Sequence, residues 1–231
     1  MNYNDYFLIE YTIPFLGFLI TLLAQIYVMS SYNKYRNIPT SGKKTGADTA
    51  RKILDANGLE NVKINKITGN LTDHYDPRNK TVNLSADIYD GTSISSVSVA
   101  AHECGHAIQD KEGYTFMKIR SLLVPITNFS SKIGYLVVII GLIFNAIGLA
   151  KFGLILLLSI LLFQLITLPV EFNASSRAKK QLIKLNIVDN DELSDSSSML
   201  HAAAFTYVAS LVTSLLQILR LALIVFGRDK D

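Results

Sequence analysis

The chain has 231 residues, of which 49% are hydrophobic and only 18% are charged. Soluble domains carry about 25% charged residues, so this composition argues against both a disordered chain and an ordinary soluble globule. A net charge of +3 gives no indication of nucleic-acid binding. The single cysteine, Cys104, excludes an internal disulfide framework.

Three long apolar runs, 11–29, 133–169 and 205–227, carry at most one charge each. A membrane-spanning helix needs about 20 apolar residues. The 133–169 run would make a single helix of roughly 55 Å, too long for a hydrocarbon core of about 30 Å. It therefore predicts a transmembrane hairpin with its turn near 149–153. Four transmembrane helices are expected, at 8–29, 133–149, 152–169 and 205–227.

The distribution of Lys and Arg predicts how these helices are oriented. Fourteen of these residues lie in 30–132 and four in 171–204, but none lies in the first ten positions. The positive-inside rule then places 30–132 and 170–204 in the cytoplasm and both termini outside, in a multi-pass protein of the cell membrane. Because no basic residue precedes the first span, it is interpreted as a retained anchor rather than a cleaved signal peptide.

The polar segment 30–132 contains signals for a small α+β element. An amphipathic helix is expected at 45–57, and Asn57-Gly58 would end it. Alternating residues predict a strand at 62–67, and a second short strand is expected at 81–84. The stretch 68–79 is interpreted as turns. The edge of the second strand is a candidate docking site for an extended peptide.

A further helix is expected from Thr92 or Ser93 to about 109, and it contains the HExxH motif His102-Glu103-Cys104-Gly105-His106. Two histidines four residues apart lie on one helix face and can bind one Zn²⁺, while the adjacent glutamate can act as general base on a water molecule. Cys104 projects from the opposite face and is interpreted as a packing residue. Two ordinary surface histidines are the alternative interpretation of the motif.

A catalytic zinc site needs a third protein ligand. Glu171 is the main candidate, because two spans separate it from His106 and the chain returns to the same side of the membrane. A solvated residue at a helix start is the alternative for Glu171, and His74 and His201 are alternative ligands. A peptidase also needs an oxyanion donor; His201 and Tyr207 are candidates, although both are also explained as boundary residues.

Five segments carry a family resemblance: Asn83-Leu84-Ser85, Ser93-Ile94, 99–109 around the motif, Leu168-Pro169-Val170-Glu171 continuing to Ala178, and 204–209. In these segments the chain resembles the YugP-type zinc metallopeptidases of bacterial membranes. The similarity covers nearly the whole chain. The arrangement is also similar, more distantly, to HtpX-type and CAAX-prenyl membrane proteases, in which a membrane hairpin separates HExxH from a glutamate ligand.

The resemblance implies a gluzincin-like site with His102, His106 and Glu171 as ligands of one Zn²⁺ and Glu103 as base. The distant relatives have an aspartate where this chain has Ser175, and an aspartate is expected at Asn173 in close relatives. The carboxylate that orients a ligand histidine in such sites is therefore expected to be weakened or supplied from elsewhere.

Together these observations predict an α-helical membrane protein with four transmembrane helices and a small cytoplasmic α+β zincin-like element. The predicted function is zinc-dependent hydrolysis of peptide bonds in a membrane-proximal or membrane polypeptide, in contact with the lipid bilayer and without nucleic acid. The alternative is a non-proteolytic, metal-stabilised membrane scaffold or regulator. A divalent-ion transporter is disfavoured, because the spans contain almost no ionisable residues.

Overall fold

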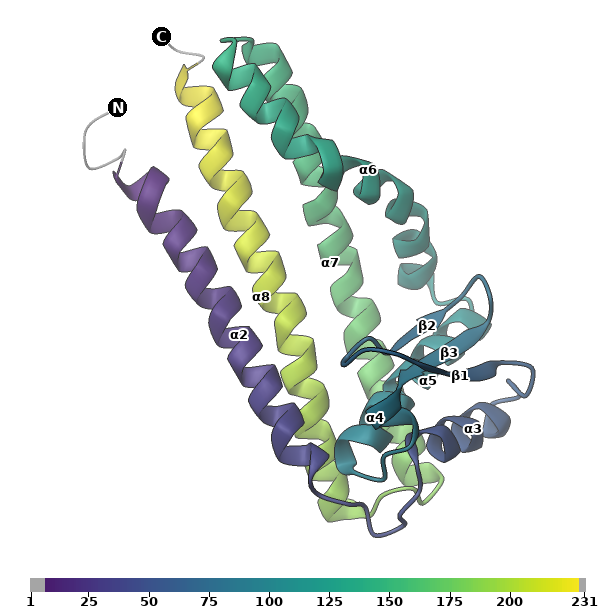
Figure 1. Ribbon diagram of the computed structural model, residues 1–231. Coiled ribbons are helices and arrows are strands. Elements are labelled where there is room, and N and C mark those ends of the chain that lie inside the picture. The colour runs from purple at the N-terminus through teal and green to yellow at the C-terminus, as the bar shows by residue number, and fades with distance from the viewer. Residues whose placement is uncertain (1–6, 229–231) are drawn as a thin grey trace. The chain divides into compact units, whose positions relative to one another are not determined.

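The computed structural model describes residues 7–228 and is mostly helical, with one small sheet (Figure 1). Its elements in chain order are η1 (Leu8–Thr12, a π-helical turn), α2 (Ile13–Arg36), α3 (Gly46–Ala56), β1 (Lys63–Ile67), β2 (His74–Asp76), β3 (Thr81–Ser85), α4 (Ala86–Tyr89), α5 (Ile94–Lys111), α6 (Thr115–Ile143), α7 (Ile147–Lys184) and α8 (Asn190–Arg228). The chain divides into two compact units, each described by itself below.

In the described part of the chain, residues 7–228, four helices are long and apolar enough to cross a membrane. They run over Ile9–Arg36, Thr115–Ile143, Ile147–Lys184 and Asn190–Gly227, and only 17% to 28% of their most apolar windows is buried. Large side chains such as Phe15, Leu122 and Phe144 are more than half exposed. Extended exposed apolar surface of this kind is typical of lipid contact. The predicted spans are the apolar parts of these longer helices, and their membrane boundaries stay a prediction.

The first unit comprises the described parts of 1–25, 119–168 and 206–231. Its hairpin turn lies at 144–146, so the predicted turn at 149–153 is wrong. Asn145 adopts a left-handed backbone with φ of 50°, and the Ala146 amide donates to the Gly141 carbonyl over 2.7 Å. The expected turn glycine, Gly153, instead lies inside α7 and lets the backbone approach Val138 closely.

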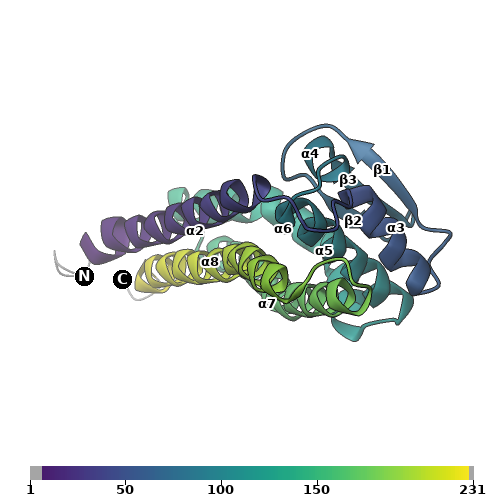
Figure 2. The ribbon, with the colours of Figure 1, turned by 90° about the horizontal axis from the view of Figure 1, so that it is seen from below.

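Helices α2 and α8 run side by side in this unit (Figures 1 and 2). The hydroxyl oxygens of Thr21 and Thr213 lie 3.1 Å apart, and Gly17 leaves room for the Thr213 methyl group. Nearer the start of α2, Glu10 pairs with Arg220 at 2.7 Å. Hydroxyl contacts and close glycine packing are the usual means by which helices associate in lipid.

The second unit comprises 26–118 and 169–205 and contains the sheet. The strand order is β1-β3-β2, with β1 parallel and β2 antiparallel to β3. The strands expected at 62–67 and 81–84 are confirmed as β1 and β3. The 74–76 strand was not predicted, because three residues in a turn-rich segment carry too little pattern. Since β3 is the central strand, the prediction that its edge is free for a peptide is wrong.

Two helices pack together beside this sheet, and both begin as the sequence predicts. Thr45 and Asp48 form a reciprocal capping box at the start of α3, and Gly58, with φ of 64°, follows its last turn. The Ser93 side chain caps α5 by accepting from the Ser96 amide. The apolar face of α3 packs in the same core as α5, and its fully buried residues are Ala50, Ile53 and Leu54.

Candidate metal centre

Helix α5 carries the two candidate histidines through the core of the second unit. His102 and His106 lie one turn apart, with ring centroids 4.8 Å apart and rings nearly perpendicular. Small residues allow α5 to be buried this deeply. Ala101, next to His102, and Cys104, between the two histidines, are both fully buried. The pair therefore presents its imidazoles from a rigid support rather than from a mobile loop.

Glu171 reaches the same place from helix α7. Gly105 faces the backbone of Ala174 so closely that an added Cβ would lie 2.6 Å from the Ala174 carbonyl oxygen. This close approach of the two helices brings Glu171 Oε2 to 3.2 Å from His102 Nε2 and 3.5 Å from His106 Nε2. The carboxylate is almost completely buried, with 3% of its side chain exposed.

The donor atoms of His102, His106 and Glu171 all lie within 4.8 Å of one another and could hold one metal ion. Within residues 7–228, no fourth His, Cys, Asp or Glu belongs to this group. Two imidazole nitrogens and one carboxylate oxygen fit zinc, and a set of three protein ligands is typical of catalytic rather than structural zinc sites. The residues present therefore fit the ion that the sequence predicts.

Both histidines have hydrogen-bond partners on the nitrogen that faces away from Glu171. His102 Nδ1 lies 3.2 Å from the Ser175 hydroxyl, and His106 Nδ1 lies 3.0 Å from Gln109 Oε1. Such partners orient ligand histidines in metal sites. Ser175, where the resemblance predicts an aspartate in distant relatives, thus contacts His102 through a hydroxyl. Gln109 was not singled out from the sequence, although its position three residues after His106 puts it on the same helix face.

Glu103 lies next to the cluster but is not part of it. Glu103 is 7% exposed. Burial raises the pKa of the Glu103 carboxyl to about 7. The neighbouring His102 lowers this pKa, and the Glu171 carboxylate raises it. A cation in the cluster would favour the carboxylate form of Glu103.

The alternative ligand candidates do not join the cluster. His74 is exposed on β2, and its ring nitrogens contact the Thr72 carbonyl and the Asn83 amide. His201 is exposed on α8. Tyr207 belongs to the first unit, so a role for it as oxyanion donor stays a prediction. Cys104 is buried with its Sγ 3.6 Å from the Ala50 carbonyl, which confirms the prediction that it packs in the core.

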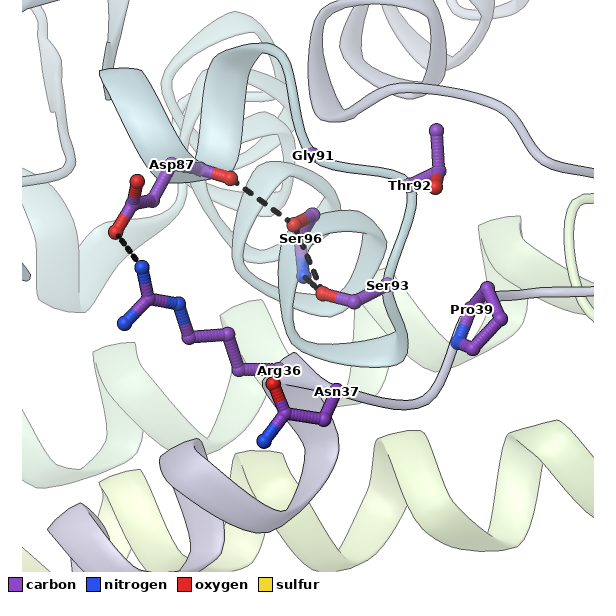
Figure 3. Close-up of a pocket in the computed structure, with 8 residues that line it drawn as sticks. All are labelled: Arg36, Asn37, Pro39, Asp87, Gly91, Thr92, Ser93 and Ser96. Atoms are coloured by element: carbon purple, nitrogen blue, oxygen red, sulfur yellow. Dashed lines mark hydrogen bonds and ion pairs between the residues drawn. The ribbon is translucent and has the colours of Figure 1, made fainter.

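A separate hollow of about 230 Å³ lies where α5 begins (Figure 3). Arg36 pairs with Asp87 at 2.6 Å on one side of it, and the Ser96 hydroxyl donates to the Asp87 carbonyl. Ser93, the cap of α5, lies beside Ser96. None of its lining residues belongs to the metal cluster.

Within residues 7–228, the structure combines four long apolar helices with a buried cluster of three side chains that could bind a metal ion such as zinc. The sequence model of a family described as "Putative neutral zinc metallopeptidase" matches residues 10–226, and the chain belongs to this family. The curated protein named "Putative membrane protease YugP" from Bacillus subtilis (strain 168) is 44% identical over 221 residues, covering 95% of this chain and 97% of its own length. The resemblance to YugP-type proteins is thereby confirmed. No solved structure gives a significant match.

Proposed function

We propose that this protein is an integral membrane zinc endopeptidase of the gluzincin type, with His102, His106 and Glu171 as the zinc ligands. The observation that carries the proposal is the buried cluster of three donors, two from α5 and one from α7. The family membership and the name of the Bacillus relative support it. A purely structural zinc site would normally be closed by four protein ligands, often thiolates.

In the proposed mechanism, a bound zinc ion supplies Lewis-acid polarisation of the scissile carbonyl and lowers the pKa of water. Glu103 accepts the proton of the attacking water and passes it to the leaving amine. Burial keeps bulk water away from the Glu103 carboxyl. Ser175 and Gln109 hold the two imidazoles so that their Nε2 atoms face Glu171.

The proposed substrate is an extended segment of a membrane-proximal or membrane polypeptide. Among the described strands, β2 pairs with β3 alone, so its other edge is unpaired. The Tyr75 hydroxyl of β2 donates to Asp110 of α5 over 2.7 Å, so a peptide added to β2 would run beside the helix that carries His102 and His106. Pairing with a free strand edge is a general way of binding extended peptides through main-chain hydrogen bonds.

The proposed location is the cell membrane, with the metal centre facing the cytoplasm. The four apolar helices and the high Lys and Arg content of 30–132 and 171–204 support this orientation. The peptide substrate would then be cleaved at the inner face of the bilayer.

The substitution Glu103→Gln tests the function, because glutamine has the size of glutamate but cannot accept the water proton. Protein hydrolysis by the full chain in detergent or lipid should fall by about 10²-fold or more, the usual contribution of a general base. Bound zinc and the thermal unfolding midpoint should stay unchanged. Glu60→Gln, the same change at an exposed turn, is the control. If Glu103→Gln restores a deletion strain as well as wild type does, the protein is instead a metal-stabilised scaffold.

A further inference from the structure

Gln109 lies in the interior of the second unit, with 0% of its surface exposed. A buried primary amide is costly unless both its oxygen and its NH₂ group have partners. Gln109 Oε1 lies 3.0 Å from His106 Nδ1, while Nε2 donates to the Val170 carbonyl over 2.8 Å and to Asn173 Oδ1 over 2.9 Å. One side chain on α5 thus connects a candidate ligand to the α7 backbone immediately before Glu171.

The donor or acceptor character of these partners determines which partners the oxygen and the NH₂ group of the Gln109 amide face. The Val170 carbonyl can only accept a hydrogen bond, so the NH₂ group of Gln109 must face it. Asn173 Oδ1 is fixed as an acceptor because Arg177 Nε, which can only donate, lies 2.7 Å away. The Gln109 oxygen is then the atom that faces His106.

This orientation determines the tautomer of His106. Since Gln109 Oε1 can only accept, the proton of the neutral imidazole lies on Nδ1, and the lone pair lies on Nε2. That lone pair is on the nitrogen 3.5 Å from Glu171 Oε2, where the metal ion is expected. His102 has no such constraint, because the hydroxyl of Ser175 can donate or accept.

We propose that Gln109 is a positioning residue for the metal centre. It holds His106 in the tautomer that binds zinc through Nε2, and it ties that histidine to the segment of α7 that carries Glu171. The inference rests on the proposed function, because it takes His102, His106 and Glu171 as the zinc ligands.

The test compares two substitutions in the full chain, with zinc affinity measured by competition against a chromophoric chelator. Gln109→Leu removes all three hydrogen bonds at similar volume and should weaken zinc binding by about 10–100-fold, the usual effect of losing such a partner. Gln109→Glu keeps an oxygen that accepts from His106 Nδ1 but loses both donors to α7. It should therefore bind zinc more tightly than Gln109→Leu.

Gln181→Leu is the matched control, because Gln181 also ties α7 to another helix end, through Asn57, but does not touch the cluster. It should bind zinc as wild type does. The thermal unfolding midpoint of the zinc-free proteins separates positioning from a general effect on packing. If Gln109 only joins α5 to α7, Gln109→Glu would bind zinc no better than Gln109→Leu, and that result overturns the inference.

If Gln109→Leu binds zinc as tightly as wild type does, the proposed positioning role of Gln109 is also overturned. If Gln109→Leu does not fold, Gln109→Glu still decides: retained zinc binding supports the role, and a loss as large as that of His106→Ala contradicts it. A wild-type protein that binds zinc but cleaves no polypeptide would contradict the proposed function and leave the role of Gln109 standing. A wild-type protein without zinc affinity would overturn both.

Discussion

Nε2 of His102 lies 3.2 Å from Oε2 of Glu171, although 69 positions and a helical hairpin separate the two residues in the chain. The contact is made in the interior, with 15% of the histidine side chain and 3% of the glutamate side chain exposed. Burying a carboxylate costs several kcal/mol unless it is paired. A cation held between Glu171 and the Nε2 atoms of the two histidines would offset that cost, in keeping with a cluster that could bind one metal ion.

Removing one of the three donors should abolish tight zinc binding. We expect about one zinc ion per chain in the wild-type protein, as a three-ligand site predicts. His102→Ala, His106→Ala and Glu171→Gln should each lose most of it in metal analysis after dialysis against a weak chelator. Glu60→Gln should keep the wild-type content. Full zinc occupancy in Glu171→Gln would remove Glu171 from the site.

Gly105→Ala should destabilise the protein although alanine is the better helix former. Alanine normally stabilises a helix interior by about 1 kcal/mol relative to glycine. Here the new methyl group would lie 2.6 Å from the Ala174 carbonyl oxygen, so α5 and α7 must move apart. Overpacking of this kind costs about 1–3 kcal/mol.

The measurement is the thermal unfolding midpoint in detergent, together with zinc affinity, because separation of the helices also draws Glu171 from the histidines. Gly148→Ala in α7 is the control, since an added methyl group there has no neighbour within 4 Å. An unchanged or raised midpoint in Gly105→Ala would show that the close approach of the helices is not required.

Ser175→Asp should strengthen zinc binding. The Ser175 hydroxyl lies 3.2 Å from His102 Nδ1 and can donate or accept, whereas a carboxylate there can only accept; it would hold the proton on Nδ1 and make the imidazole a better ligand. Ser175→Ala should have the opposite effect, a loss of about 10-fold. Competition titrations measure both, with Ser176→Asp as the control for added charge. Weaker zinc binding in Ser175→Asp than in Ser175→Ala would contradict this role of position 175.

The three candidate ligands could be predicted from the sequence because simple geometric rules bring them together. The spacing of His102 and His106 follows from one helical turn, and the parity of the spans directs attention to Glu171. The strand 74–76 was missed because it is stabilised by pairing with β3 rather than by its own pattern. Gln109 was missed for a similar reason, since its partners Val170 and Asn173 lie more than 60 positions away.

The error in the hairpin turn has a different cause. Lys151 is the one charged residue of the 133–169 run and Gly153 follows it closely, so the charge pattern predicts the turn there. The chain turns instead at Asn145, one of the few residue types besides glycine that adopts a left-handed backbone at low cost. Gly153 instead allows α7 to pack closely against Val138 of α6. This contact between two helices cannot be predicted from the residues around Gly153 alone.

The orientation in the membrane gives the last prediction. Lys and Arg are concentrated in 30–132 and 171–204, so these segments should face the cytoplasm, and the α6–α7 turn should face outward. In a Cys104→Ala background, a membrane-impermeant maleimide added to intact cells should label Phe144→Cys, whose native side chain is 76% exposed at that turn. It should not label Glu60→Cys or Asp191→Cys until the cells are permeabilised. Permeabilised cells, in which all three positions should react, control for reactivity. Labelling of Glu60→Cys and Asp191→Cys in intact cells, with Phe144→Cys protected, would reverse the topology and place the metal centre, and with it the proposed proteolysis, on the outer face.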